Sequence, residues 1–164
     1  LADVDLVFID VETTGLYPVF GDRIVELAGL KVRDGREIDE FCELLDPRRP
    51  ISPGAAAANG ITDEMLLGRP LFGEVAAAFL SFVGEAFIVA HNAPFDLGFL
   101  AKELEIARVT PPEGPVVDTL ILSRRAFNFA SNSLSRADRV RRRLSRSSRS
   151  PSASSKCWRY WRKA

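Results

Sequence analysis

The chain has few of the cysteines that cross-link small secreted proteins and few of the histidines that form histidine-rich metal centres. Its 164 residues include two cysteines and one histidine. Cys42 and Cys157 are too few for a disulfide framework, which favours a reducing, cytoplasmic setting. No apolar run is long enough to cross a bilayer, and the first residues do not look like a signal peptide, so we expect no membrane partner.

Basic and acidic residues are equal in number but unequally placed. The chain holds 22 of each, and residues 135–164 hold eleven of the basic residues with one acid, Asp138. These last thirty residues therefore carry a charge of +10, and the first 134 carry −10. We predict one domain over 1–134, large enough to bury a core, and an arginine- and serine-rich tail over 135–164 that is disordered.

Two acidic residues follow the first predicted strand. The run Val4–Ile9 has apolar residues at consecutive positions from Leu6 onward, which is typical of a central strand covered on both faces. Asp10 and Glu12 are two positions apart and so project from one face where that strand ends. Close carboxylates raise each other's pKa, and Mg²⁺ or Mn²⁺ relieves the repulsion. Taken alone, such a pair more often just ends a strand in solvent, since short acidic motifs recur by chance.

Thr13, Thr14 and Gly15 continue this segment as a turn. The turn offers hydroxyls and backbone N–H groups, and the glycine allows the chain or a ligand to approach closely. These properties suit the end of a nucleotide.

A second polar segment follows the apolar strand Ala86–Ala90. Asn92 is placed to cap a helix and Pro94 suits its first turn, so Asp96 falls near a helix N-terminus. Asp96 alone could be a first-turn acid stabilised by the helix dipole. Phe95 could be a core residue or could pack on a base or sugar.

The two segments in this order, Asp10 to Gly15 and His91 to Asp96, resemble the DnaQ-like branch of the DEDD 3′–5′ exonucleases. This family includes the proofreading subunit of bacterial DNA polymerase III and related ribonucleases. Ile51–Pro53, Asn59–Leu66 and Val117–Leu120 are similar to the family's intervening regions, so the resemblance covers Val4 to about Leu134.

The resemblance implies a ribonuclease H-like α/β fold: a mixed sheet of three antiparallel strands and then parallel strands, flanked by helices. The residue pattern agrees. Ile24–Val32 and Ile38–Leu45 flank an Asp-Gly hairpin signal, and Pro70–Phe82 and Asp96–Leu104 space their apolar residues as helices do.

In the mechanism that the resemblance implies, two divalent ions, Mg²⁺ or Mn²⁺, act at a 3′-terminal phosphodiester. Asp10 would bridge both ions, Glu12 would hold one, and Asp96 would hold the other through water. The substrate-binding residues implied by the same motifs are Thr13, Thr14, Gly15, Asn59, Asn92 and Phe95. Asn59 stands where family members often carry histidine beside the 3′ nucleotide.

The family's third motif, a histidine general base followed five positions later by an aspartate, is absent from this chain. His91 is the only histidine and belongs to the second motif, where we expect a structural role. Asp118 matches a position that is not a metal ligand. Asp138 has Ser133 five positions before it and does not restore the pair. We therefore expect impaired activity.

The tail has three possible origins. It could be a translated frameshift, which we favour because the resemblance stops just before the missing motif. It could be a nucleic-acid-binding arm with Trp158, Tyr160 and Trp161 stacking on bases, or a serine-arginine tail that binds proteins. Two functions follow: a 3′–5′ exonuclease of the proofreading or repair type, acting on a DNA or RNA 3′ end with a polymerase or helicase partner, or a non-catalytic nucleic-acid-binding protein.

Overall fold

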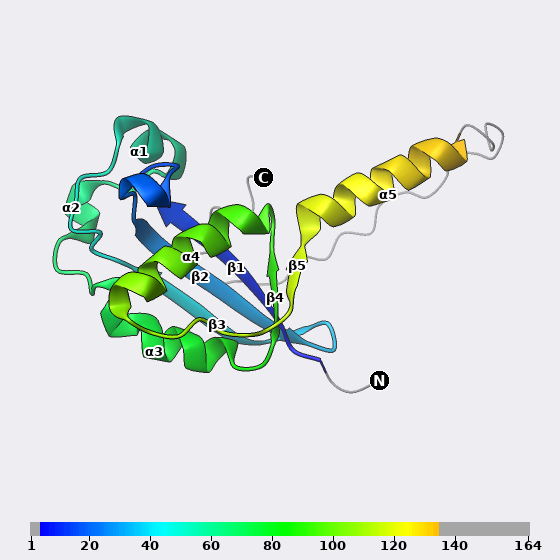
Figure 1. Cartoon of the computed structure of the whole chain (residues 1–164), viewed down its shortest axis with the longest axis horizontal. Helices are drawn as coiled ribbons and strands as arrows, with labels where there is room; N and C mark the ends of the chain where they lie inside the picture. The colour runs from blue at the N-terminus through cyan, green and yellow to red at the C-terminus, as the bar shows by residue number, and fades with distance from the viewer. Residues whose placement is uncertain (1–3, 135–164) are drawn as a thin grey trace. The chain divides into compact units, whose positions relative to one another are not determined.

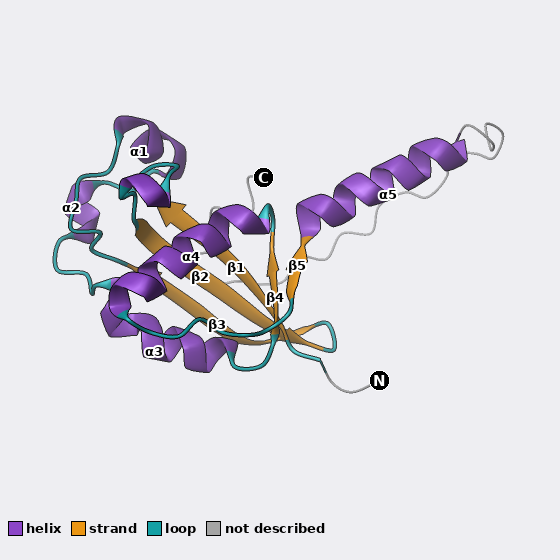
Figure 2. Cartoon of the chain, viewed as in Figure 1, coloured by secondary structure: helices purple, strands orange, loops and turns teal. Residues whose placement is uncertain are grey.

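The computed structural model describes residues 4–134, with side chains described as far as Ala126 (Figures 1 and 2). Its contacts divide the chain into two compact units, residues 1–121 and 122–164, and the sheet lies in the first. The predicted disorder of the tail lies outside the described residues. The domain boundary at residue 134 therefore stays a prediction.

The sheet has five strands in the order β3-β2-β1-β4-β5 (Figure 2). The first three are antiparallel neighbours, and β4 and β5 run parallel to β1, which confirms the predicted mixed sheet. The β2–β3 hairpin turns at Asp34 and Gly35, both with positive φ, as an Asp-Gly turn requires. The strand bounds are β1 (Leu6–Thr13), β2 (Ile24–Arg33), β3 (Arg36–Leu44), β4 (Phe87–Ala90) and β5 (Val116–Asp118).

Two of the helices match predicted segments, α3 (Phe72–Val83) and α4 (Ala93–Ala107). The sequence pattern indicates no helix between residues 53 and 66, where the structure has two short ones, and a local cap explains the start of the first. Ser52 accepts the Ala55 N–H at the start of the first. No helix in the described part of the chain is long and apolar enough to cross a membrane. The other helices are α1 (Pro53–Asn59), α2 (Asp63–Leu66), α5 (Thr119–Leu134) and the 3₁₀ helix η1 (Pro18–Phe20).

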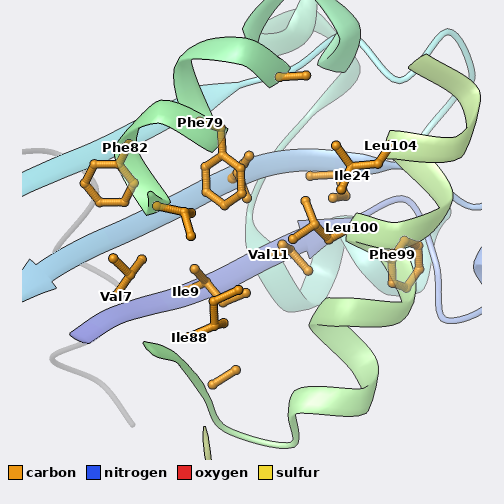
Figure 3. Packing of buried hydrophobic residues seen from close by; sticks show 14 of the residues in the cluster. Val7, Ile9, Val11, Ile24, Phe79, Phe82, Ile88, Phe99, Leu100 and Leu104 are labelled. Atoms are coloured by element: carbon orange, nitrogen blue, oxygen red, sulfur yellow. The ribbon is translucent and has the colours of Figure 1, made fainter. Parts of the chain in front are cut away.

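The main core lies between one face of the sheet and helices α3 and α4. Val7, Ile9 and Val11 of β1 point toward Phe79 of α3 and Leu100 of α4 (Figure 3). The opposite face of β1 is less covered, because Leu6 and Phe8 are only half-buried. The apolar run predicts a central strand that is buried on both faces. The strand is central, but the prediction is only partly right about burial, because the second face of β1 is half-buried.

A buried ion pair ties β2 to α4. Arg23 donates from Nε and Nη2 to the two carboxylate oxygens of Glu103, at 2.7 Å each, and Glu103 also accepts the Ile24 N–H at 3.2 Å. Glu103 is 2% exposed. The two carboxylate oxygens of Glu103 therefore accept hydrogen bonds from Arg23 and Ile24, where the chain enters β2. These bonds fix the end of the loop that connects β1 to β2.

Replacing Glu103 with alanine should destabilise the fold strongly, because it leaves the Arg23 guanidinium and the Ile24 N–H without their acceptor. Breaking a buried ion pair in this way costs roughly 3 kcal/mol or more. The exposed Lys102–Glu105 pair is a matched control, and Lys102→Ala should cost under about 0.5 kcal/mol. Urea unfolding of both variants checks this, and equal losses would contradict the assigned role.

Candidate active site

The site lies where β1 continues past the end of its parallel neighbour. Strand β4 pairs only with Leu6–Phe8, whereas β2 pairs with the whole of β1. The last residues of β1 therefore have an open backbone edge on the β4 side. Ligands bind characteristically outside the carboxyl ends of strands at such a point.

Asp96 fills part of this open edge. Its Oδ1 accepts the N–H of Val11 at 3.1 Å, so a side chain from the first turn of α4 takes the place of a strand partner. Asp96 is 3% exposed. This bond fixes the start of α4 against β1 between Asp10 and Glu12, and it brings the two sequence segments together as predicted.

Asp10 and Glu12 project from the same face of β1, opposite to the buried Val11. Across the antiparallel ladder Asp10 lies beside Ala28, and Glu12 lies directly beside Glu26. Asp10 is exposed and Glu12 is half-buried. The two acids therefore stand at the rim of the sheet, between solvent and the buried Asp96.

The turn that delivers Asp96 is held by backbone geometry rather than by the predicted cap. Asn92 has a left-handed backbone (φ 65°), and its side chain makes no capping hydrogen bond. Instead Oδ1 of Asp118 accepts the Asn92 N–H at 3.2 Å. Asn92 is thus the N-cap residue of α4 with Pro94 in the first turn, as predicted, but in this left-handed turn its side chain makes none of the capping hydrogen bonds.

The site carboxylates are partly desolvated, Asp96 the most, and those of Glu12 and Asp96 are affected by neighbouring charge. Burial and then the charge of Asp10 raise the pKa of Asp96 to about 7, against the lowering effect of the Val11 hydrogen bond. Burial and the charges of Asp10, Glu26 and Asp96 raise the pKa of Glu12 to about 7. Desolvation also raises the pKa of Asp10. In the described part of the chain none of Asp10, Glu12 and Asp96 forms an ion pair with a basic side chain.

Glu26 is a fourth carboxylate that the sequence analysis missed. It faces Glu12 across the ladder, and burial followed by the charge of Asp10 raises its pKa. Like charges directly opposite each other destabilise an antiparallel pair. The place of Glu26 in the site could be predicted only from the register in which β1 pairs with β2. The sequence does not specify that register, because the two strands are joined by a ten-residue loop.

The acids do not form a ready-made metal cage. Among the residues with described side chains, 4–126, no group of three or more His, Cys, Asp or Glu is arranged to hold a metal ion. The structure therefore brings the acidic residues to the same end of β1 without arranging their oxygens as metal ligands. Metal binding stays a prediction, and it requires these side chains to move toward a bound cation.

The turn after β1 uses its hydroxyls within the chain. Thr13 Oγ1 donates to the Gly15 carbonyl at 2.6 Å, and Thr14 Oγ1 donates to Asp22 at 3.1 Å. Both threonines are buried. Both hydroxyls thus close the turn, and binding of a nucleotide by Thr13 and Thr14 stays a prediction. A Cβ on Gly15 would collide with the Asp22 carboxylate, which confirms the close approach predicted for this glycine.

Asn59 and Phe95 lie beside the same strand end. Asn59 is 4% exposed, donates to the Thr13 carbonyl at 3.3 Å and accepts the Ile61 N–H at 3.0 Å. The Asn59 amide therefore holds the carboxyl end of β1, the strand that carries Asp10 and Glu12. Phe95 is half-buried, with its ring 5.1 Å from that of Phe99, so it packs on the core and keeps an accessible part.

His91 has the structural contact predicted for it. Its Nδ1 lies 3.0 Å from Thr119 Oγ1, and that hydroxyl donates to the Ala90 carbonyl at 3.3 Å, so the histidine donates from Nδ1. Asp118 accepts backbone N–H groups of Asn92, Leu120 and Ile121. Burial raises the pKa of Asp118, but these hydrogen bonds prevail and lower it.

Stability should fall with rising pH in metal-free protein. The pKa of Asp96 rises from 3.8 to about 7 on folding, so the folded chain holds more protons between these values and the free energy of unfolding decreases across that range. Asp96→Asn keeps an acceptor for Val11 and should flatten the curve. Thermal unfolding in EDTA from pH 5 to 8 checks this, with Glu43→Gln on exposed β3 as control. An unchanged slope in Asp96→Asn would contradict it.

Comparison with known proteins places the chain in a family. The model of the exonuclease family RNase_T matches residues 7–145, beyond the Leu134 at which we placed the end of the resemblance. DNA polymerase III PolC-type of Halalkalibacterium halodurans is 44% identical over 132 residues, which are 80% of this chain and 9% of that protein. A DNA polymerase III subunit epsilon-like protein of Rhodobacter capsulatus is 42% identical over 133 residues, 79% of this chain and 19% of that protein.

Solved structures agree with these relatives. Exonuclease X in complex with 5′ overhanging duplex DNA is 34% identical with a TM-score of 0.58, over 74% of this chain and 64% of that one. Exonuclease I in complex with the inhibitor BCBP is 20% identical with a TM-score of 0.70, over 77% and 31%, and shows the shared ribonuclease H-like fold. The chain thus spans less than a fifth of either curated relative, and it belongs to the exonuclease family that includes the DnaQ-like 3′–5′ exonucleases.

Proposed function

We propose that this chain acts on the 3′ end of a nucleic acid strand and hydrolyses its last phosphodiester. The observation that carries the proposal is the approach of Asp96 to Asp10 and Glu12 at the open end of β1, with no basic side chain to neutralise them in the described residues. Structural ion pairs place acids beside bases, whereas this grouping leaves its negative charge uncompensated. Strongly perturbed carboxylates at such a position are typical of a functional site.

The donor set fits hard divalent cations. Asp10, Glu12 and Asp96 present only carboxylate oxygens, the ligands that Mg²⁺ and Mn²⁺ prefer, and burial raises the pKa of each, with neighbouring negative charge adding to the shift of Glu12 and Asp96. Such ions, when bound, would supply Lewis-acid stabilisation of the charge that develops at phosphorus. Asp10, Glu12 and Asp96 are the residues that would hold them. At neutral pH, Glu12 and Asp96 would lose their protons as the ions bind.

The remaining residues of the site position these acids. The Val11 N–H fixes Oδ1 of Asp96, which leaves Oδ2 as the oxygen directed to a ligand. The Asn59 amide holds the Thr13 carbonyl at the end of the strand. Phe95 offers the accessible part of its ring beside Asp96, and we propose that the terminal base or sugar packs there.

The sequence lacks the histidine that the family's third motif would supply to deprotonate the attacking water. His91 uses Nδ1 for Thr119, and it is the only histidine in the sequence. Loss of a general base typically removes 10²- to 10⁴-fold of rate. We therefore propose slow hydrolysis, because the aspartate of the family's third motif is missing as well. Because the relatives are DNA polymerase III proteins, we propose a polymerase as partner and DNA as substrate for this chain.

Activity should depend on Asp10. A 5′-labelled single-stranded DNA or RNA, incubated with excess protein and Mn²⁺ or Mg²⁺, should give a ladder that shortens from the 3′ end. Asp10→Asn should slow it by about 100-fold or more, because the acid is needed for the metal site. Glu43→Gln, which removes an acid from exposed β3, should leave the rate within twofold. Degradation unaffected by Asp10→Asn would identify a contaminant and contradict the proposal.

A second candidate is a non-catalytic nucleic-acid-binding protein, favoured by the charge of +10 over residues 135–164. Clustered arginines release counterions from phosphates, so this mode predicts affinity that falls steeply with salt. Removing residues 135–164 should then weaken oligonucleotide binding and flatten its salt dependence, as measured by fluorescence anisotropy between 50 and about 200 mM NaCl. A response that is independent of the tail would rule out this candidate.

A further inference from the structure

The loop between β1 and β2, residues 14–23, is closed at its two ends by backbone and side-chain hydrogen bonds. The Thr14 N–H donates to the Arg23 carbonyl at 2.9 Å, and the Arg23 N–H donates to Thr14 Oγ1 at 3.1 Å. A loop whose ends meet in this way is a compact unit with its own shape. In Figure 1 it is the dark blue segment, with η1, just beyond the arrowhead of β1.

Asp22 organises the inside of this loop. Its carboxylate accepts the Tyr17 N–H at 3.0 Å and the Thr14 hydroxyl at 3.1 Å, and Arg49 Nη1 lies 3.3 Å from it. Further bonds join the Phe20 N–H to the Tyr17 carbonyl and the Gly21 N–H to the Pro18 carbonyl. The polar groups of the loop are therefore directed inward.

The apolar side chains of the loop are directed outward. Val19 and Phe20 are each 80% exposed and Tyr17 is 57% exposed, with Leu16 beside them at 66%. The rings of Tyr17 and Phe20 meet edge to face, 5.8 Å apart at 64°. An ordinary surface loop exposes polar side chains, whereas this loop exposes apolar ones. These apolar side chains are not part of the buried core. A contiguous exposed apolar patch marks an interaction site.

The position and surroundings of the patch favour nucleic acid as its occupant. The loop follows Thr13 directly, so Tyr17 stands five residues from Glu12 and the patch begins where the proposed strand-end site stops. Residues 15–21 carry no charged side chain, whereas Arg49, partly exposed, lies at the loop's margin. Aromatic side chains bordered by a basic group are typical of surfaces that stack the bases of a single strand.

We propose that Tyr17, Val19 and Phe20 form a platform for the unpaired bases immediately upstream of the 3′-terminal nucleotide. The proposal rests on the proposed function, because it needs the strand end to lie at Asp10, Glu12 and Asp96. The platform is sequence-tolerant, since every base offers a flat face to an aromatic ring. The proposal predicts that the chain binds a single strand of several nucleotides with higher affinity than it binds a mononucleotide.

The test is equilibrium binding of a fluorescent 12-nucleotide single strand to the whole chain in EDTA, at salt high enough to weaken binding by the tail. The double variant Tyr17→Ala with Phe20→Ala should bind about tenfold or more weakly. Leu67→Ala, which removes an equally exposed apolar side chain elsewhere, is the matched control and should bind as the parent does. Phe20→Tyr, which keeps the ring, should also retain binding.

Other outcomes separate this proposal from its alternatives. All these side chains are exposed, so thermal unfolding of the double variant should match that of the parent chain. Unchanged oligonucleotide affinity would overturn the platform, as would a parent chain that dimerises through the patch, detected by sedimentation. Asp10→Asn should abolish the degradation ladder without weakening the binding measured in EDTA. If the ladder depends on Asp10 while the double variant binds normally, the platform fails and the proposed function stands.

Discussion

The hydrogen bond from the Val11 N–H to Asp96 is the constraint on which the site depends. It forms because β4 stops pairing with β1 at Phe8, which leaves the end of the central strand without a partner on one side. A carboxylate from a helix takes that place and is buried with its negative charge next to two further acids. The fold thus maintains a concentration of charge that would be unfavourable unless a cation or protons compensated it.

The architecture follows from short-range signals in the sequence. The apolar run before Asp10, the Asp-Gly hairpin and the helical spacing of Phe79 and Phe82 each act locally, and their strands and helices are present in the structure. The strand period placed Asp10 beside Glu12, whereas only the family resemblance of the two segments joined Asp96 to them.

The details that failed depend on contacts between distant segments. Glu26 joins the site through a cross-strand register that no local pattern specifies. Thr14 turns inward because Asp22 and Arg23 are there to receive it. The Asn92 side chain makes none of the capping hydrogen bonds because its backbone is left-handed, and Asp118 of β5 fixes that turn by accepting the Asn92 N–H. In each case the residue type was informative, but its partner was set by the tertiary fold.

The central claim is that these acids seat divalent cations, and calorimetric titration with Mn²⁺ near pH 7 in buffers of different ionisation enthalpy tests it most directly. Because the pKa values of Glu12 and Asp96 are raised to about 7, binding should release protons, and less should be released at higher pH. Asp96→Asn should weaken binding and reduce the protons released. Mn²⁺ binding that is absent, or identical in the parent chain and Asp96→Asn, would contradict the account.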